Sequence, residues 1–312
     1  MATPPERRRK PTATSAFGVG RRESHDATAF YDRFSAPDIS DDDHVNASQV
    51  VDEIITGDAR KMDALADSSV ALVVTSPPYF AGKDYEQELG KGGIPADYVE
   101  YLALLRDVFA ECVRVLEPGG RICVNVANLG RKPYRSLSAD VIGILQDDLG
   151  LLLRGEVIWL KAEGASGSCA WGSYLSATNP VLRDVTERIV IASKGRFNRA
   201  QSEKKKQRRK DAGLPWEDDL TTEQFAEYTL DVWRFRPESA KRVGHPAPFP
   251  VELPARCIHL FTYKGDLVLD PFAGAGATAI AAVNAGRHYV GYELDPAYAE
   301  AARRRVEATT RH

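Results

Sequence analysis

Residues 266–282 read DLVLDPFAGAGATAIAA, and this stretch decides the fold. Its first part is apolar and ends at Asp270, which predicts a buried strand. Gly274 and Gly276 follow, and glycine allows the backbone to turn tightly and to approach a ligand closely. The alanine-rich part predicts a helix whose free N–H groups point back at that ligand. The stretch therefore predicts a strand, a turn and a helix, with a ligand site at the turn.

The next predicted strand, HYVGYELD at 288–295, ends in an acidic residue, Glu293. A carboxylate about 20 residues after a glycine turn is suited to accept hydrogen bonds from ribose hydroxyls. A Gly-x-Gly alone is an ordinary turn in many α/β domains, and the following acid makes the ligand site the better interpretation. The third glycine of the dinucleotide pattern is absent, because Thr278 and Ala279 stand there. This favours a nucleoside ligand without the pyrophosphate of NAD.

Strands and helices alternate along the chain. Further strands are expected within DEIITGDA (52–59), VALVVTS (70–76), RICVNVA (121–127), EVIWL (156–160) and ERIVIAS (187–193). Helices are expected at 98–116, 138–149, from about 251, after the glycine turn up to Gly286, and at 296–306. Alternation of this kind predicts an α/β fold, a Rossmann-like and mostly parallel sheet with helices on both faces.

A second motif, Ser76-Pro77-Pro78-Tyr79, follows directly after the buried strand at 70–76. Two prolines can simply make a rigid turn. In parallel sheets, however, ligands bind beyond the carboxyl ends of the strands. If the strands at 70–76 and 266–270 are neighbours, the two loops share one pocket.

Together the two motifs resemble those of the S-adenosylmethionine-dependent DNA amino-methyltransferases. In that family a [Ser/Asn/Asp]-Pro-Pro-aromatic motif carries the chemistry and Phe-x-Gly-x-Gly holds the cofactor; here they read SPPY (76–79) and FAGAG (272–276). The catalytic motif comes first, which resembles the circularly permuted β class. The resemblance covers about residues 50–308. It implies a class I methyltransferase fold with a variable target-recognition region between the motifs.

The resemblance assigns the chemistry to Ser76, Pro77, Pro78 and Tyr79. The Ser76 hydroxyl and the Pro77 carbonyl would accept hydrogen bonds from the exocyclic amine of the target base. The prolines fix φ, so the carbonyl is positioned before the substrate arrives. Tyr79 would stack on a base flipped out of the duplex.

The resemblance implies S-adenosyl-L-methionine as cofactor. No metal site is expected, because the four cysteines are scattered and show no CxxC pairing. Asp58 is placed like the acid near the adenine amine, and GHPAPFP at 244–250 resembles the segment near the methionine end. His245 in that segment is interpreted as structural. The expected cofactor-binding residues are Asp58, Ala59, Asp270, Pro271, Phe272, Gly274, Gly276, Thr278, Glu293, Leu294, Pro248 and Phe249.

The target base follows from two features. No cysteine is preceded by proline, so a carbon-5 cytosine mechanism has no nucleophile. Serine at the first motif position is typical of cytosine-N4 enzymes, whereas adenine-N6 enzymes more often have aspartate. The N4 amine of cytosine is therefore expected, with adenine-N6 methylation as the alternative. Methylation of a protein glutamine and an inactive DNA-binding protein are less favoured alternatives.

Charge is unevenly distributed. The net charge is −3, but residues 194–210 contain nine Lys/Arg and one Glu, so this segment carries +8 and the rest −11. The segment is expected to contact the phosphates of double-stranded DNA through Lys194, Arg196, Arg199, Lys204, Lys205, Lys206, Arg208, Arg209 and Lys210. Residues that read base edges are expected within about 161–240. Arg234, Arg236 and, just beyond this range, Arg242 are candidates for guanine contacts by residue type. A homodimer and a cognate restriction endonuclease are candidates for further partners. The enzyme is expected to act in a restriction-modification system or as an orphan enzyme without such an endonuclease.

Composition and boundaries complete the expectations. Hydrophobic residues make up 43% of the 312, which supports a core. No apolar stretch has the roughly 18 residues of a membrane helix, and no signal peptide is recognised, so a cytoplasmic protein is expected. The four cysteines are expected to be inert. Residues 1–45 are predicted as a tail, 46–160 as the catalytic half, 161–243 as core strands with the recognition region, and 244–312 as the cofactor-binding half.

Overall fold

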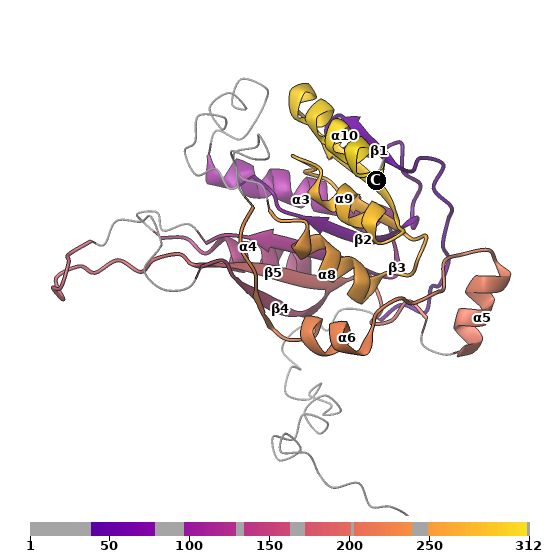
Figure 1. Cartoon of the computed structure of the whole chain (residues 1–312), viewed down its shortest axis with the longest axis horizontal. Coiled ribbons are helices and arrows are strands. Elements are labelled where there is room, and N and C mark those ends of the chain that lie inside the picture. Colours follow the sequence, from indigo (N-terminus) through magenta and orange to yellow (C-terminus); the bar gives the residue numbers. More distant parts are fainter. Residues whose placement is uncertain are drawn as a thin grey trace, which may run out of the picture. The chain divides into compact units, whose positions relative to one another are not determined.

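A computed structural model of the chain describes residues 39–78, 97–128, 134–162, 172–200, 203–238 and 249–310. The chain divides into two compact units, Met1–Asp38 and Ile39–His312. Every described residue belongs to the second unit, which is drawn in Figure 1. Within it, residues 39–45 of the predicted tail include a contact with the body, because Ser40 N–H donates to the Gly195 carbonyl over 2.6 Å.

A single eight-stranded sheet forms the centre of this unit, in the order β1-β8-β7-β2-β3-β5-β4-β6. The strands are β1 (Glu53–Thr56), β2 (Val70–Thr75), β3 (Leu116–Val126), β4 (Leu152–Leu160), β5 (Thr186–Ser193), β6 (Val232–Arg234), β7 (Leu267–Asp270) and β8 (His288–Glu293). Among these, β5 pairs antiparallel with β3 and β4, and the other pairings are parallel. The predicted mostly parallel α/β fold is confirmed.

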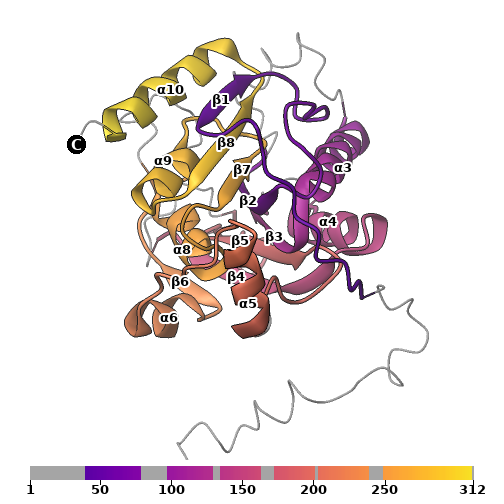
Figure 2. The same cartoon turned by 90° about the vertical axis from the view of Figure 1, so that its right-hand side faces the viewer.

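Helices cover both faces of the sheet, as Figure 2 shows. On one face lie α3 (Tyr98–Val115), α4 (Leu137–Gly143) and the π-helical turn η3 (Ile144–Asp148), packed on one apolar cluster. On the other lie α8 (Glu252–Phe261), α9 (Ala277–Asn284) and α10 (Pro296–Thr310), packed on a second. Within the described residues, no helix is long and apolar enough to cross a membrane.

A local signal in the sequence explains where α3 begins. Asp97 caps α3 by accepting a hydrogen bond from the backbone N–H of Glu100, as expected for an acidic N-cap. The helix ends at Val115 and β3 begins at once, so the Pro-Gly-Gly turn expected at 118–120 lies inside the strand. Gly119 has φ 79°, and a β-carbon there would lie 2.4 Å from the Asn198 carbonyl oxygen. The predicted stop is therefore a site of close backbone packing.

Three elements were not expected from the sequence: α5 (Glu203–Asp211), α6 (Thr222–Tyr228) and β6. The helix α5 is almost entirely charged, and β6 has only three residues, so neither shows a clear apolar period. The sheet also crosses the boundaries expected at 160/161 and 243/244, since β4, β5 and β7 belong to it. The two boundaries therefore remain predictions made from the sequence.

The sheet has two distinct ends. We call carboxyl edge the end formed by Thr56, Thr75, Val126, Leu160, Arg234, Asp270 and Glu293, where the seven parallel strands finish. The opposite end is the amino edge. Because β5 runs the other way, it starts at the carboxyl edge and finishes at the amino edge, where Ser193 pairs with Arg121.

Candidate active site

The two sequence motifs meet at the carboxyl edge. β2 pairs with β7 in parallel, with Val73 opposite Leu269, so the residues that follow both strands emerge side by side. The Thr75 hydroxyl, one residue before Ser76, donates to Asp270 Oδ1 over 2.7 Å. Segments separated by nearly 200 residues in the chain are thus joined directly.

Asp270 is the centre of this junction. Its buried carboxylate also accepts from the Thr278 hydroxyl over 2.8 Å and from the Phe272 N–H over 3.1 Å. Burial raises the pKa of Asp270 to about 6, although its hydrogen bonds act in the opposite direction. The carboxylate therefore fixes the end of β2 to the glycine turn.

The diproline motif is firmly placed. Ser76 and Pro78 are half-buried and Pro77 is buried, while Tyr79 lies outside the described residues. Asn125 Nδ2 on the neighbouring strand β3 donates to Ser76 Oγ over 3.4 Å, a long hydrogen bond.

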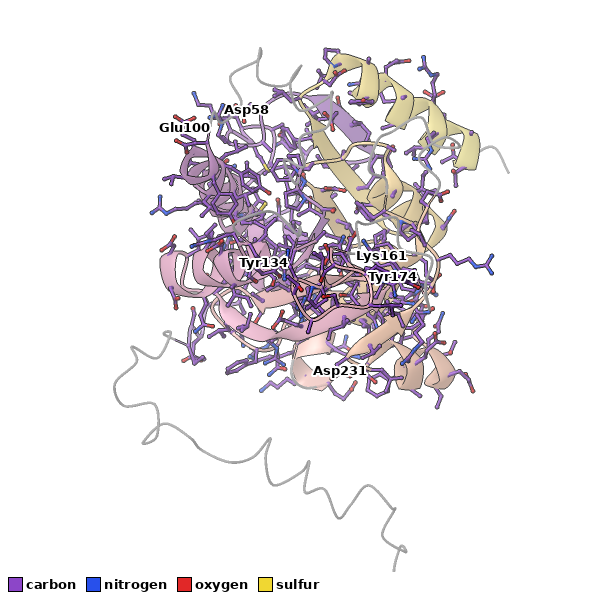
Figure 3. All side chains as sticks on the ribbon, turned by 90° about the vertical axis from the view of Figure 1, so that its left-hand side faces the viewer. Asp58, Glu100, Tyr134, Lys161, Tyr174 and Asp231 are labelled. Atoms are coloured by element: carbon purple, nitrogen blue, oxygen red, sulfur yellow. The ribbon has the colours of Figure 1, made fainter. Side chains whose placement is uncertain are left out.

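Asn125 belongs to a polar group that the sequence analysis missed. Its Nδ2 also donates to Glu187 Oε2 over 2.5 Å, and Glu187 Oε1 pairs with Lys161 Nζ over 2.9 Å. Figure 3 views the molecule from the side opposite to Figure 2 and labels Lys161 near its centre. The only signal in the sequence was a polar residue in or directly after each apolar strand. That these residues meet depends on the strand order, which the sequence does not show.

The glycine turn holds an acid in position. Gly276 has φ 76°, and a β-carbon there would lie 3.2 Å from Ala302 Cβ. The Gly274 N–H donates to Glu293 Oε2 over 2.8 Å, and Glu293 Oε1 accepts from the Asp295 N–H. Burial raises the pKa of Glu293. The Gly274 amide thus orients the Glu293 carboxylate.

The next strand brings a second acid close by. β1 pairs with β8, with Thr56 opposite Glu293, and Asp58 follows two residues later. Arg60 donates to Asp58 through Nε and Nη2, and this hydrogen bonding lowers the pKa of Asp58. Two carboxylates therefore lie at adjacent strand ends beside the glycine turn.

The remaining expected cofactor residues differ in exposure. Ala59, Pro271 and Thr278 are buried, Phe272 is half-buried and Leu294 is exposed. Phe249 packs against the apolar cluster beneath α8 and α9. Pro248 and His245 lie outside the described residues.

The basic segment leaves from the other end of the sheet. Lys194 follows the last residue of β5, and its Nζ donates to the Leu116 carbonyl over 2.7 Å. Arg196 is buried and donates to the Asp42 carbonyl over 2.7 Å. Figure 2 shows α5 facing the viewer, on the side opposite to the one seen in Figure 3. The segment therefore lies at the amino edge, away from Ser76.

Two further arginines of the segment are in the interior. Arg199 contacts Glu117 and pairs with Asp266 Oδ2 over 2.6 Å, and all three side chains are no more than 4% exposed. Arg209 joins them at 3.2 Å from Glu117 Oε1. Both guanidinium groups lie over the ring of Tyr263. We name Arg199, Arg209, Glu117 and Asp266 the amino-edge cluster.

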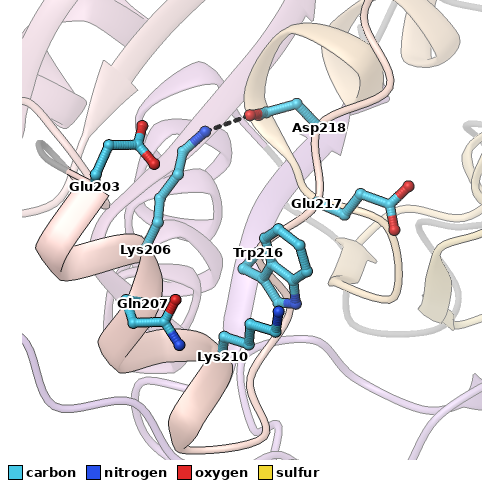
Figure 4. A pocket seen from close by; sticks show the side chains of 7 residues that line it. All are labelled: Glu203, Lys206, Gln207, Lys210, Trp216, Glu217 and Asp218. Atoms are coloured by element: carbon cyan, nitrogen blue, oxygen red, sulfur yellow. Dashed lines mark hydrogen bonds and ion pairs between the residues drawn. The ribbon is translucent and has the colours of Figure 1, made fainter.

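Several of the side chains that were expected to contact DNA have protein partners. Lys194, Arg196, Arg199 and Arg209 all hold protein groups. Lys206 Nζ pairs with Asp218 Oδ2 at 2.5 Å, and Lys210 Nζ lies over Trp216, 4.7 Å from the ring centroid. Both pairs are drawn in Figure 4. Lys204 and Arg208 are exposed and Lys205 is half-buried, all three on α5 at the amino edge.

Other arginines lie at the carboxyl edge. β6 pairs in parallel with β4, with Arg234 opposite Leu160, so the chain leaves β6 on the side of Ser76. Arg234 and Arg236 are both exposed. Arg242 lies outside the described residues.

Solved structures with the same architecture are known. TTHA0409 from Thermus thermophilus, assigned as a DNA modification methylase, is 30% identical in its complex with S-adenosyl-L-methionine, with a TM-score of 0.60. That match covers 82% of this chain and 95% of the other. The PvuII DNA methyltransferase, named cytosine-N4-specific, has a TM-score of 0.59 at 19% identity, covers 83% and 90%, and shows the fold alone.

Relatives with similar sequences are also named as methyltransferases. The type II methyltransferase M.MjaI of Methanocaldococcus jannaschii is 31% identical over 273 residues, which span 78% of this chain and 87% of the relative. The type II methyltransferase M.BglI of Bacillus subtilis is 27% identical, over 80% and 84%. A family model described as DNA methylase, N6_N4_Mtase, matches residues 70–304, from β2 through the glycine turn to α10. With both motifs joined at one edge of the sheet, the chain belongs to the N6_N4 DNA methylase family.

Proposed function

We propose that this chain transfers a methyl group from S-adenosyl-L-methionine to the exocyclic N4 amine of a cytosine flipped out of duplex DNA. The observation that carries the proposal is the hydrogen bonding of Asp270 to both Thr75 and Thr278. It joins the catalytic strand to the glycine turn, so a cofactor at one motif lies beside an amine at the other.

The residues at the glycine turn fit this cofactor. Glu293 and Asp58 provide carboxylate oxygens at neighbouring strand ends, suited to ribose hydroxyls and to the adenine amine. Phe272 follows β7, which lies between β8 and β2 in the strand order. Its half-buried ring offers an apolar surface. When bound, S-adenosylmethionine supplies an electrophilic methyl group on a sulfonium. TTHA0409, which binds it in its solved complex, has the same fold at 30% identity.

The diproline motif would orient the amine. The lone pair of an exocyclic amine is delocalised into the base ring, so it is a poor nucleophile. Hydrogen-bond acceptors on its two protons, Ser76 Oγ and the Pro77 carbonyl, help to localise the lone pair toward the methyl group. Because Pro77 and Pro78 fix φ, these acceptors need little reorganisation during the reaction. Tyr79 follows in sequence and is proposed to stack on the flipped base.

Serine at position 76 supports cytosine as the target. A neutral hydroxyl in place of the aspartate is typical of N4 enzymes, and the order of the motifs supports the permuted β class. Adenine-N6 methylation is the second candidate, because the two amines present similar geometry. Membership of a DNA methylase family leaves a protein glutamine substrate without support.

The DNA would approach the carboxyl edge. A flipped base must enter beside Ser76, and Arg234 and Arg236 are exposed at that edge. Arginine pairs well with phosphates and with guanine edges. We therefore propose these two arginines as DNA contacts and withdraw α5 from that role.

The biological context follows from the relatives. M.MjaI and M.BglI are both named type II methyltransferases. By analogy, we propose that the chain protects a specific DNA site in a restriction-modification system, with a cognate endonuclease that cuts the same site. Its substrate would place it in the cytoplasm.

One assay tests the function and the base together. DNA is incubated with the protein and S-adenosylmethionine labelled in the methyl group, digested to nucleosides and analysed by mass. Labelled N4-methylcytosine is the expected product. Labelled N6-methyladenine would replace the first candidate by the second, and DNA without label would overturn the proposal.

A further inference from the structure

Three polar side chains form a row above an apolar surface. Asn125, Glu187 and Lys161 lie on or directly after the neighbouring strands β3, β5 and β4. Two residues inward along the same strands are Cys123, Ile189 and Trp159, all buried in one apolar cluster. Side chains at i and i+2 of a strand share a face. The row therefore lies at the carboxyl edge, on the face from which Asn125 reaches Ser76.

Hydrogen-bond chemistry fixes the orientation of the Asn125 amide. An ionised carboxylate only accepts hydrogen bonds, so the Asn125 atom 2.5 Å from Glu187 Oε2 must be the amide nitrogen. The same nitrogen is 3.4 Å from Ser76 Oγ and has a second hydrogen to donate. Lys161 Nζ holds the other Glu187 oxygen at 2.9 Å. Glu187 thus determines which end of the amide Ser76 meets.

We propose that Glu187, held by Lys161, is a positioning residue for methyl transfer that acts on Ser76 through Asn125. The inference rests on the proposed function and adds a residue to its machinery. Glu187 is 112 positions after Thr75 in the sequence, and only the antiparallel insertion of β5 brings it to this edge.

The physical effect is control of a hydroxyl rotor. A serine hydroxyl has one hydrogen and two lone pairs. If Asn125 donates to one lone pair, the Ser76 hydrogen cannot point toward Asn125. The second lone pair is then the one that accepts a proton of the target amine. Without the Glu187 carboxylate the amide could rotate, present its oxygen to Ser76 and draw the hydroxyl hydrogen toward itself. Holding one arrangement before the substrate arrives is preorganisation.

The test is a double-mutant cycle between Glu187→Gln and Ser76→Ala, measured as single-turnover methylation of duplex DNA. Glutamine keeps the shape of Glu187 but can turn either an oxygen or a nitrogen toward Asn125. We expect Glu187→Gln to lower the rate about tenfold in the wild-type background and less than about twofold in the Ser76→Ala background. Affinities for DNA and for the cofactor, measured by titration, should stay within about twofold.

Glu156→Gln is the matched control. Glu156 lies on β4, next to β5, and its carboxylate is 3.9 Å from Arg188 with both side chains 38% exposed. The substitution removes the same charge from a strand-to-strand ion pair that does not touch Asn125, so the rate should not change. A second variant, Lys161→Met, should lower the rate in the same direction as Glu187→Gln, by about threefold.

The outcomes separate the two claims. An active wild type in which Glu187→Gln loses the same factor in both backgrounds overturns this inference and leaves the proposed function intact. A change in unfolding stability without a change in rate would make Glu187 purely structural and would also overturn it. A wild type that methylates no DNA overturns the proposed function and the inference with it.

Discussion

The two edges of the sheet satisfy buried charge in different ways. At the amino edge, Arg199 and Arg209 form ion pairs with Glu117 and Asp266, so each buried charge lies next to an opposite charge. At the carboxyl edge, Asp270 is held by two hydroxyls and a backbone N–H, and burial raises its pKa instead. The first arrangement is suited to stability. The second places neutral donors around an acid next to Ser76 and is suited to ordering a site.

The largest expected effect breaks the amino-edge cluster. Arg199→Met leaves two carboxylates in the interior with only Arg209 as partner within the cluster. Removing one member of a buried ion pair costs about 3–5 kcal/mol, and we expect that loss in the free energy of unfolding measured in urea. The methylation rate per folded molecule should not change. Arg208→Met, on the exposed side of α5, is the control and should change stability by less than about 0.5 kcal/mol. A loss of rate with Arg199→Met would mean that the two edges are coupled.

Asp270, the buried acid at the carboxyl edge, should make the free energy of unfolding depend on pH. The pKa of Asp270 is raised from 3.8 to about 6 in the folded state, so the folded chain holds this proton where the unfolded chain has released it. Its contribution to the free energy of unfolding therefore falls as pH rises from about 4 to 6, by on the order of 3 kcal/mol. Asp270→Asn should remove this fall, seen as a difference between the two proteins.

Asp58 provides a control of opposite sign. The hydrogen bond from Arg60 lowers its pKa, so its contribution to stability is present above about pH 4 and is lost as pH falls through the lowered value. Asp58→Asn should therefore remove a gain in stability with rising pH. Equal pH profiles for wild type and Asp270→Asn would show that the acid is not protonated by burial.

Ser76→Ala tests the catalytic side of the comparison. The methyl group of alanine cannot accept a proton of the amine, and loss of one preorganised hydrogen-bonding group costs about 100-fold in rate. We expect that loss in single-turnover methylation, with cofactor affinity unchanged within about twofold, because Glu293 and Asp58 stay in place. A variant with the full rate would remove Ser76 from the mechanism.

The smallest expected effect concerns which edge of the sheet binds DNA. Two double variants remove the same charge: Arg234→Gln with Arg236→Gln at the carboxyl edge, and Lys204→Gln with Arg208→Gln on α5. The first should weaken DNA binding about tenfold and reduce the salt slope by about 2, since each phosphate contact contributes about 0.9. The second should stay within about twofold. The reverse result would restore α5 as the DNA-binding surface.

Sequence reasoning predicted the fold because most elements carry a strong local signal. The charge-free run of β2, the apolar run of β7 and the apolar spacing of α3 indicate their own type. The joining of the two motifs was a conditional expectation, and the pairing of Val73 with Leu269 meets its condition.

What could not be predicted depends on strand direction and on distant partners. Nothing local shows that β5 runs against its neighbours, yet that direction sends residues 194–210 to the amino edge. A run of cations looks the same whether it faces solvent or Glu117. In the same way, Glu187 became a candidate only when β5 was placed between β3 and β4.

Because β5 runs against its neighbours, the chain that follows it leaves the sheet at the amino edge. That chain returns to the sheet as β6, the last strand in the sheet order. Ala212 and Gly213, just past the last turn of α5, are exposed, and nothing lies within 4 Å of a β-carbon built on Gly213. The amides of Ala212 and Gly213 close the last turn of α5 on the Arg208 and Lys210 carbonyls, so added sequence would follow Gly213, at an exposed turn of the kind that tolerates insertions. A fluorescent reporter or an immobilisation tag introduced there would be carried at the amino edge, away from Ser76, and would suit single-molecule measurements.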